Sequence, residues 1–302
     1  MLTAIISNSD QFIPLAYTLA RQRLQVCIFL APPEDPFIHR KAVAFCQTMN
    51  IPVKIEEKPG DVYEWMDDVR PNVLFVMGYR QLLDVNHKVM NNFPSFNIHP
   101  GPLPAFRGPV PVFWQLKNGT PFLGITIHHL SSRFDKGPIV WYREIPDQPH
   151  YNYGIIHQIF SQLAVEGVLF IFDMLARKLP LPVIERAGIR ESYHKRPELK
   201  DVSVNWQEMT AVEICNLVRA CNPWNKGALT TFNGQEIKLM DARVVTGNTE
   251  SGPGTVLCME EKICIACKDG KLISTDMFFF NDCFLPSYYL HSYGIKDGVQ
   301  LR

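Results

Sequence analysis

The stretch SFNIHPGPLPAFRGPVPVFWQLKNGTPFLGITIHHLSSRFDKG, residues 95–137, decides the fold. It opens with SFNIH, a short and largely apolar run, and VLFVMG at residues 73–78 is a run of the same kind. Runs of this length that end in polar or small residues are typical of strands buried in a parallel sheet. In open α/β sheets, ligands bind at the carboxyl ends of such strands. We therefore expect a functional site where residues 95–99 end.

Three polar side chains in this stretch are the candidate catalytic residues. Asn97 and His99 are two positions apart, so on an extended strand they point to the same face. The prolines that follow stiffen the loop and restrict how the chain leaves the strand. If the loop that carries Asp135 folds back, an amide, an imidazole and a carboxylate meet. Such a set can polarise a carbonyl, stabilise an oxyanion and move a proton.

The order of these motifs resembles the catalytic core of the formyltransferases that use 10-formyltetrahydrofolate. The matching motifs are Asn97-Ile98-His99, Leu103-Pro104, Arg107-Gly108, residues 124–128 (GITIH) and Asp135-Lys136-Gly137. The resemblance covers roughly the whole chain and is strongest from residue 97 to residue 137. It departs at Lys136, where the family usually has Thr or Ala, so this chain adds a cation near the expected site.

This chemistry suggests a role for each of the three residues. We hypothesise that Asn97 donates a hydrogen bond to the formyl oxygen and that His99 stabilises the charge that develops there. Asp135 is expected to orient or charge His99 and, through water, to help take the proton from the attacking amine. A carboxylate beside a histidine raises its pKa, which would favour an oxyanion partner.

The resemblance also implies which residues hold the two substrates. The residues expected at the folate are Gly78, Tyr79, Arg80, Gln81 and Leu82, together with Ser132 and Phe134. From the residues alone, 78–82 could equally be a strand that ends in a turn. Pro104 and Arg107 are expected at the acceptor, although Arg107 could instead pair with a surface acid. His128 and His129 alternate in direction on a strand, so only one of them can face the site.

The rest of the chain predicts an α/β domain followed by a smaller β domain. Strand-like and helical runs alternate from residue 3 to residue 83, which favours a mostly parallel, Rossmann-like sheet. The loop SNSDQF has no glycine, so a dinucleotide cofactor is not expected. Short alternating runs with turn pairs at Asn233-Gly234 and Asp269-Gly270 predict a small β-barrel, which the resemblance implies is OB-like. We predict a catalytic domain at 1–190, a linker at 191–204 and a C-terminal domain at 205–302.

The composition limits which binding partners and which cellular compartment we expect for this protein. Lys plus Arg number 30 and Asp plus Glu number 30, so the net charge of zero removes the bulk electrostatic argument for nucleic acid. The chain opens without a basic segment and cleavage pattern, and no apolar run is expected to reach the length that spans a bilayer. We therefore expect a cytoplasmic protein with reduced thiols and no membrane contact. Cys264 and Cys267 lack a second ligand pair, so no metal is expected. His157 lies in a long helical run and is expected to be structural.

The resemblance leaves the amine acceptor open. Methionyl-tRNA formyltransferases share the length and the second domain, but they carry a basic loop where this chain has APPEDPFIHRKAV at residues 31–43. Because tRNA binding relies on Lys and Arg contacts to phosphate, we expect a small-molecule amine, either an amino sugar nucleotide or an amino acid derivative, with tRNA less favoured. Residues 111–114 (PVFW) also resemble the formylation domains of peptide synthetases. A hydrolase of the same folate, an inactive folate-binding scaffold and the oligomeric state stay open.

Overall fold

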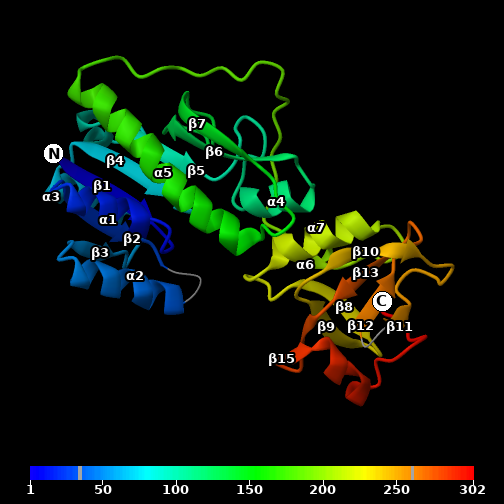
Figure 1. Ribbon diagram of the computed structural model, residues 1–302. Helices are drawn as coiled ribbons and strands as arrows, with labels where there is room; N and C mark the ends of the chain where they lie inside the picture. Colours follow the sequence, from blue (N-terminus) through cyan, green and yellow to red (C-terminus); the bar gives the residue numbers. More distant parts are fainter. Residues whose placement is uncertain (33–35, 260–261) are drawn as a thin grey trace. The chain divides into compact units, whose positions relative to one another are not determined.

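The computed structural model describes residues 1–32, 36–259 and 262–302, and the chain forms two compact units (Figure 1). The first unit comprises Met1–Pro111, Phe122–Ile145 and His157–His194. The second comprises Val112–Pro121, Pro146–Ile156 and Lys195–Arg302. The boundaries expected at residues 190 and 204 stay a prediction.

The first unit is built on a seven-stranded sheet in the order β3-β2-β1-β4-β5-β6-β7. Its strands are β1 (Leu2–Ser7), β2 (Gln25–Leu30), β3 (Val53–Ile55), β4 (Val73–Met77), β5 (Ser95–His99), β6 (Phe122–His129) and β7 (Ile139–Pro146). Its helical elements are α1 (Ile13–Arg21), α2 (Pro36–Thr48), α3 (Asp61–Val69), η1 (Lys88–Asn92) and most of α5 (Tyr153–Ala176). Strands β1 to β5 pair in parallel, whereas β6 runs antiparallel to β5. The α/β fold class predicted from the sequence is confirmed.

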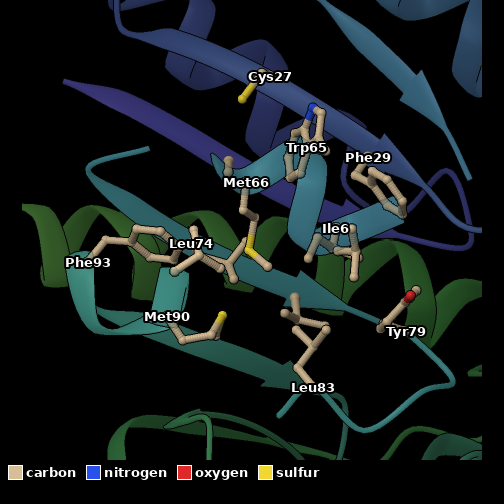
Figure 2. Close-up of a cluster of buried hydrophobic side chains, with 14 of the residues drawn as sticks. Ile6, Cys27, Phe29, Trp65, Met66, Leu74, Tyr79, Leu83, Met90 and Phe93 are labelled. Carbon is tan, nitrogen blue, oxygen red and sulfur yellow. The ribbon is translucent and has the colours of Figure 1, made fainter. Parts of the chain in front are cut away.

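The sheet is apolar on both faces because helices cover both. On one face, Trp65 and Met66 of α3 pack against Phe29 and Leu74, and Figure 2 shows this cluster. Leu74 is followed by Phe75, which must point to the other face. There its ring lies 5.9 Å from the ring of Phe172 in α5. This burial on both sides explains why the strands are nearly continuous apolar runs rather than alternating ones.

Helix α5 corrects one expectation. It has 24 residues and contains an 18-residue window with a mean hydropathy of 1.7, so by length and composition it could cross a membrane. The expectation that no apolar run reaches that length is therefore wrong. The helix packs on the sheet instead of standing apart from it. A Cβ added at Gly167 would lie 2.5 Å from Cδ1 of Ile127 and 2.7 Å from the ring of Trp141, so the glycine permits a close approach of helix and sheet. Such packing is typical of a core helix.

The segment that follows α5 has no helix or long strand up to residue 198, but it is bound to the first unit along much of its length. The amide of Ile184 donates to the carbonyl of Ile139 at 2.8 Å, and Arg186 donates to the carbonyl of Leu103 at 3.0 Å. Further on, Tyr193 forms a parallel bridge with Arg107. We call residues 183–194 the strap.

The second unit is an antiparallel β domain with short helices, as its alternating runs predict. Its helical elements are α4 (Pro111–Lys117, mostly in this unit), α6 (Leu199–Val202), α7 (Ala211–Cys221) and η2 (Ser287–Tyr293). Its strands are β8 (Ala228–Phe232), β9 (Gln235–Leu239), β10 (Arg243–Asn248), β11 (Val256–Met259), β12 (Lys262–Ala266), β13 (Lys271–Thr275), β14 (Met277–Phe280) and β15 (Cys283–Pro286). They form two four-stranded sheets, β10-β13-β12-β11 and β15-β14-β9-β8. Asn233 and Gly234 both have positive φ and make the tight turn of the β8–β9 hairpin.

Candidate active site

The three candidate catalytic residues meet at the carboxyl end of β5. Nδ1 of His99 lies 3.3 Å from Oδ1 of Asp135, and Nδ2 of Asn97 lies 3.5 Å from the same oxygen. The His99 and Asp135 side chains are 5% and 9% exposed, so water screens the interaction poorly. The structure therefore brings together the amide, imidazole and carboxylate that the strand spacing predicts. Their chemical roles stay a prediction.

The Asp135 loop reaches the strand through a tight fold of the backbone. Asp135 has a φ of +57°, a left-handed conformation that is uncommon outside glycine. The amide of His129 donates to the carbonyl of Pro138 at 2.9 Å and closes the base of the loop. The second carboxylate oxygen of Asp135 accepts a hydrogen bond of 3.0 Å from the amide of Gly108. Neighbours in the fold thus hold both oxygens of the carboxylate in place.

The hydrogen bonds of His99 restrict where its protons can be. Nε2 donates to the carbonyl of Phe106 at 2.9 Å, because a carbonyl oxygen can only accept. Nδ1 faces the carboxylate of Asp135, which is also an acceptor when ionised. A neutral ring with its proton on Nε2 would turn a lone pair toward that carboxylate. When Nδ1 also carries a proton, it can donate that proton to Oδ1 of Asp135.

Burial and neighbouring charges have opposite effects on the pKa values of His99 and Asp135. Burial lowers the pKa of His99, and the carboxylate of Asp135 opposes that change without reversing it. The expected effect of Asp135, which raises the pKa of His99, is present, but the pKa still lies below its ordinary value because desolvation of the imidazolium is the larger effect. Burial raises the pKa of Asp135, but His99, His128 and the Gly108 amide outweigh it and lower that pKa to about 2. Asp135 is therefore a carboxylate beside an imidazole whose protonated form is disfavoured by burial.

His128 joins the site although sequence reasoning left it undecided. It lies opposite Asn97 in the β5–β6 register, and its side chain is 2% exposed. Nδ1 donates to the carbonyl of His129 at 2.7 Å, which leaves Nε2 to accept from Nδ2 of Asn97 at 3.1 Å. His129 points to the other face, where its ring lies 4.8 Å from that of Phe96. The prediction that only one of the two histidines faces the site is confirmed, and the cross-strand register identifies which one.

The two N–H groups of the Asn97 amide have different hydrogen-bond partners. One is taken by His128 at 3.1 Å. The other lies at 3.5 Å from Asp135, which is the outer limit of a hydrogen bond. The second N–H is therefore the one that a bound carbonyl oxygen could take over at little cost.

The residues expected at the folate lie in two places. Gly78 follows β4 directly with a φ of +83°, and a Cβ there would lie 2.5 Å from Oδ1 of Asn8. The Tyr79 hydroxyl donates to Oε1 of Glu56 at 2.7 Å, and the Gln81 amide donates to the same oxygen at 3.3 Å. The buried Glu56 was not identified from the sequence. Arg80 and Leu82 are exposed, as are Ser132 and Phe134 in the Asp135 loop.

The residues expected at the acceptor lie beside Asp135. Pro104, Arg107 and Asp135 line a small cavity of about 100 Å³ together with Lys136 and Glu191. Nη1 of Arg107 pairs with Glu191, and Nη2 donates to the carbonyl of Phe134 at 3.2 Å. The pairing with an acid, one of the two alternatives left open for Arg107, is thus present. Glu191 itself was not identified, because it is brought in by the strap from far along the chain.

The remaining candidates are structural. His157 is half-buried, the Gln11 amide is 2.5 Å from its Nδ1, and desolvation lowers its pKa to about 4 against the opposing charge of Asp10. Cys264 and Cys267 are buried, and burial raises the pKa of Cys267 to about 12. Within residues 1–32, 36–259 and 262–302, no group of three or more His, Cys, Asp or Glu side chains could hold a metal ion.

A mostly parallel sheet carries Asn97 and His99 on β5 and brings the Asp135 loop against them. Two family models match the chain, the formyl transferase model at residues 33–169 and the model of the formyl transferase C-terminal domain at residues 198–277. The chain belongs to the formyl transferase family, and it is a formyltransferase.

Individual relatives agree with this family. The methionyl-tRNA formyltransferase of Roseiflexus castenholzii is 29% identical over 270 residues, covering 86% of this chain and 85% of that protein. HypX from Aquifex aeolicus, solved in complex with tetrahydrofolic acid, superposes with a TM-score of 0.71 at 19% identity and covers 98% of this chain. The match spans 48% of HypX, so this chain has about half its length. The N-formyltransferase from Helicobacter canadensis, in complex with folinic acid and dTDP-3-aminofucose, has a TM-score of 0.66 at 17% identity and covers 91% of this chain and 99% of its own.

The acidity of Asp135 predicts how stability changes with pH. A carboxyl group with a folded pKa of about 2 and an ordinary value of 3.8 stabilises the protein above pH 4 by about 2 kcal/mol. That contribution is lost as the pH falls from the ordinary value through the folded one, and roughly half is gone by about pH 3. We expect the difference in free energy of unfolding between wild type and Asp135→Asn to shrink by about 1 kcal/mol between pH 5 and pH 3.

Urea unfolding at the two pH values measures this difference. Asp173→Asn is the matched control, because that carboxylate is 59% exposed and its ion pair with Arg177 lies in water. A difference that stays constant from pH 5 to pH 3 in the Asp135 variant would show that the site does not hold Asp135 ionised.

Proposed function

We propose that this protein transfers the formyl group of 10-formyltetrahydrofolate to the primary amine of a small-molecule acceptor. The observation that carries the proposal is the convergence of Asn97 and His99 on one oxygen of Asp135, which lies 3.5 Å from Nδ2 of Asn97 and 3.3 Å from Nδ1 of His99. An amide donor, an acidic imidazolium and a carboxylate are the groups that amine formylation requires.

The reaction forms one bond and breaks another. The neutral amine nitrogen attacks the formyl carbon, and the carbonyl oxygen gains negative charge. The second N–H of Asn97, which turns from Asp135 to the substrate, and the His99 ring in its protonated form stabilise that charge. The bond from the formyl carbon to the folate nitrogen then breaks, and a proton passes from the amine to that nitrogen. The products are the formamide and tetrahydrofolate.

The lowered pKa of His99 suits proton transfer in this step. An imidazolium that releases its proton easily is a stronger general acid for the leaving nitrogen. Asp135 stays ionised, keeps the ring in place and can accept the amine proton through water. His128 holds the Asn97 amide with its second N–H turned toward the reacting centre. We assign the folate to residues 78–82 and to Ser132 and Phe134, which supply backbone groups and exposed side chains near strand ends.

The acceptor is proposed to be a small molecule because the chain lacks a strong basic character. Its net charge is zero, and a protein that holds tRNA depends on cationic contacts to phosphate. The first charged residues in the stretch at residues 31–43 are acids, and residues 33–35 lie outside the described part of the chain. Initiator tRNA is the second candidate, since curated relatives that match both parts of the chain are methionyl-tRNA formyltransferases. All eight cysteines are free in the structure, which supports a reducing compartment such as the cytoplasm.

An acceptor panel tests the proposal. Purified protein is incubated with 10-formyltetrahydrofolate and, separately, amino sugar nucleotides, free amino sugars, amino acid derivatives and methionine-charged initiator tRNA. We expect tetrahydrofolate release to depend on one class of small amine and to yield its formamide in equal amount. Formylation of tRNA alone would overturn the preference for a small molecule. Formate release at the same rate with and without an acceptor would make the protein a hydrolase.

A further inference from the structure

The small cavity beside Asp135 has a charged lining that the proposed chemistry does not use. Arg107, Lys136 and Glu191 line it together with Asp135, and its volume is about 100 Å³. A space of that size accommodates a group of a few heavy atoms. Both cations contact the same atom of the lining, Oε1 of Glu191. Two positive side chains therefore converge on one carboxylate oxygen at the wall of the reaction centre.

Arg107 is the better fixed of the two cations. Its side chain is 15% exposed, and Nη2 is held by the carbonyl of Phe134 at 3.2 Å. Its Nε is buried and has no hydrogen-bond partner within the part of the chain that the structure describes. Burying an unpaired N–H of a charged group is costly, so a ligand oxygen at this position would be favourable. Lys136 supplies a second and more mobile cation, with its side chain 36% exposed.

Glu191 is held at the cavity by the backbone of the strap. The amide of Arg107 donates to the carbonyl of Ser192 at 3.0 Å, and the amide of His194 donates to the carbonyl of Arg107 at 2.8 Å. The Ser192 hydroxyl accepts from the amide of Phe106 at 2.9 Å. The Glu191 side chain is nevertheless 46% exposed, so it can rotate into solvent while the strap stays bound.

We propose that Arg107 and Lys136 form an anion subsite beside the reacting centre and that the acceptor carries a carboxylate or phosphate group close to its amine. Glu191 occupies the subsite when no acceptor is bound and leaves it when the acid group of the acceptor arrives. In this arrangement Asp135 faces the amine of the acceptor, whereas Arg107 and Lys136 face its carboxylate or phosphate group. This inference rests on the proposed function and narrows its acceptor to molecules that carry both groups a few atoms apart.

An anion titration tests the subsite without any acceptor. The protein is labelled with [15N]arginine, and the Nε–H resonance of Arg107 is assigned by its loss in Arg107→Lys. Sodium acetate and sodium phosphate are each titrated at constant ionic strength set with sodium chloride. We expect a saturable shift of that resonance with at least one anion; the responding anion indicates whether the acid is a carboxylate or a phosphate.

Two variants should change the affinity in opposite directions. Glu191→Gln removes the competing carboxylate and should tighten anion binding on the order of tenfold. Lys136→Met removes one cation and should weaken it by a similar factor. Glu166→Gln is the matched control, because it removes a carboxylate from the exposed pair with Arg143 and should leave the titration unchanged. If neither anion shifts the resonance saturably, in wild type or in Glu191→Gln, the subsite does not exist.

Acceptor kinetics then connect the subsite to catalysis. The acceptors are matched pairs, an amino acid with its carboxamide and an amino sugar phosphate with the free amino sugar. Lys136→Met should raise KM for the acidic member about tenfold with little change in kcat, and the neutral member should react alike in both proteins. An equal effect on both members would overturn the assignment of the acceptor. If no acceptor is formylated by any variant, the proposed function fails, while the anion titration still decides on the subsite.

Discussion

The His99→Ala variant should lose formyl transfer by a factor on the order of 10³ or more in kcat/KM. In the proposed mechanism, the protonated His99 ring stabilises the oxyanion and supplies the proton to the leaving nitrogen. Removal of one oxyanion donor costs about 10²- to 10³-fold, and removal of a general acid costs about 10²- to 10⁴-fold. The two losses overlap because one side chain does both, so we do not expect their product.

Folding must be measured alongside activity in this variant. The alanine leaves the Phe106 carbonyl and the Asp135 carboxylate without their buried partner, which should lower the free energy of unfolding by about 1–3 kcal/mol. Rates are therefore compared at a temperature where urea titration shows both proteins fully folded. His291→Ala is the control, since that side chain is exposed in the second unit. A folded His99→Ala protein with activity within tenfold of wild type would remove His99 from the mechanism.

The Gly137→Ala variant should lose both stability and activity through the backbone. A Cβ at this position would lie 1.7 Å from the carbonyl oxygen of His129 and 3.1 Å from Nδ1 of His128. The end of β6 cannot move away easily, because the carbonyl of the next residue, Pro138, accepts a hydrogen bond of 2.9 Å from the His129 amide. The loop must therefore move away from β6 and carry Asp135 with it. We expect a loss of about 3 kcal/mol in the free energy of unfolding, at the upper end of overpacking effects.

Activity should fall further than the loss of stability explains. A displacement of about 1 Å at a catalytic group can cost on the order of 10²-fold, so folded Gly137→Ala protein should retain about 1% of wild-type kcat/KM. Gly252→Ala is the matched control, because the nearest atom to its added Cβ is the Thr255 hydroxyl at 4.0 Å. Urea titration and formyl-transfer assays are run on both. Wild-type stability in Gly137→Ala would mean that the loop is not held against β6 as described.

The local sequence pattern was sufficient to predict the parts of the site that lie on one strand. Asn97 and His99 share a face because the period of a strand is two, and the turn at Asn233-Gly234 follows from the positive φ that both residues tolerate. The fold class follows in the same way from alternating apolar runs. The helical run at residues 151–178 was also predictable, but its ability to span a membrane by length was not recognised.

Contacts between distant segments could not be predicted in this way. Glu191 reaches Arg107 over 84 positions and Lys136 over 55, and no periodicity links such residues. Glu56 follows β3 and Tyr79 follows β4, and the two side chains meet because the carboxyl ends of these parallel strands lie on the same side of the sheet. That contact depends on strand order. The position of His128 opposite Asn97 depends on the register of β6 against β5.

The amino-acid sequence by itself placed Asn97 and His99 on one face of a strand, and the resemblance of its motifs to the formyltransferases indicated the family and the Asn-His-Asp set. Only the tertiary structure decided which histidine joins the set, how burial outweighs Asp135 in setting the pKa of His99, and that one strap residue, Glu191, pairs with both cations beside the site. The physical reason is that desolvation and charge pairing depend on distances through space, whereas strand and turn preferences depend on neighbours along the chain.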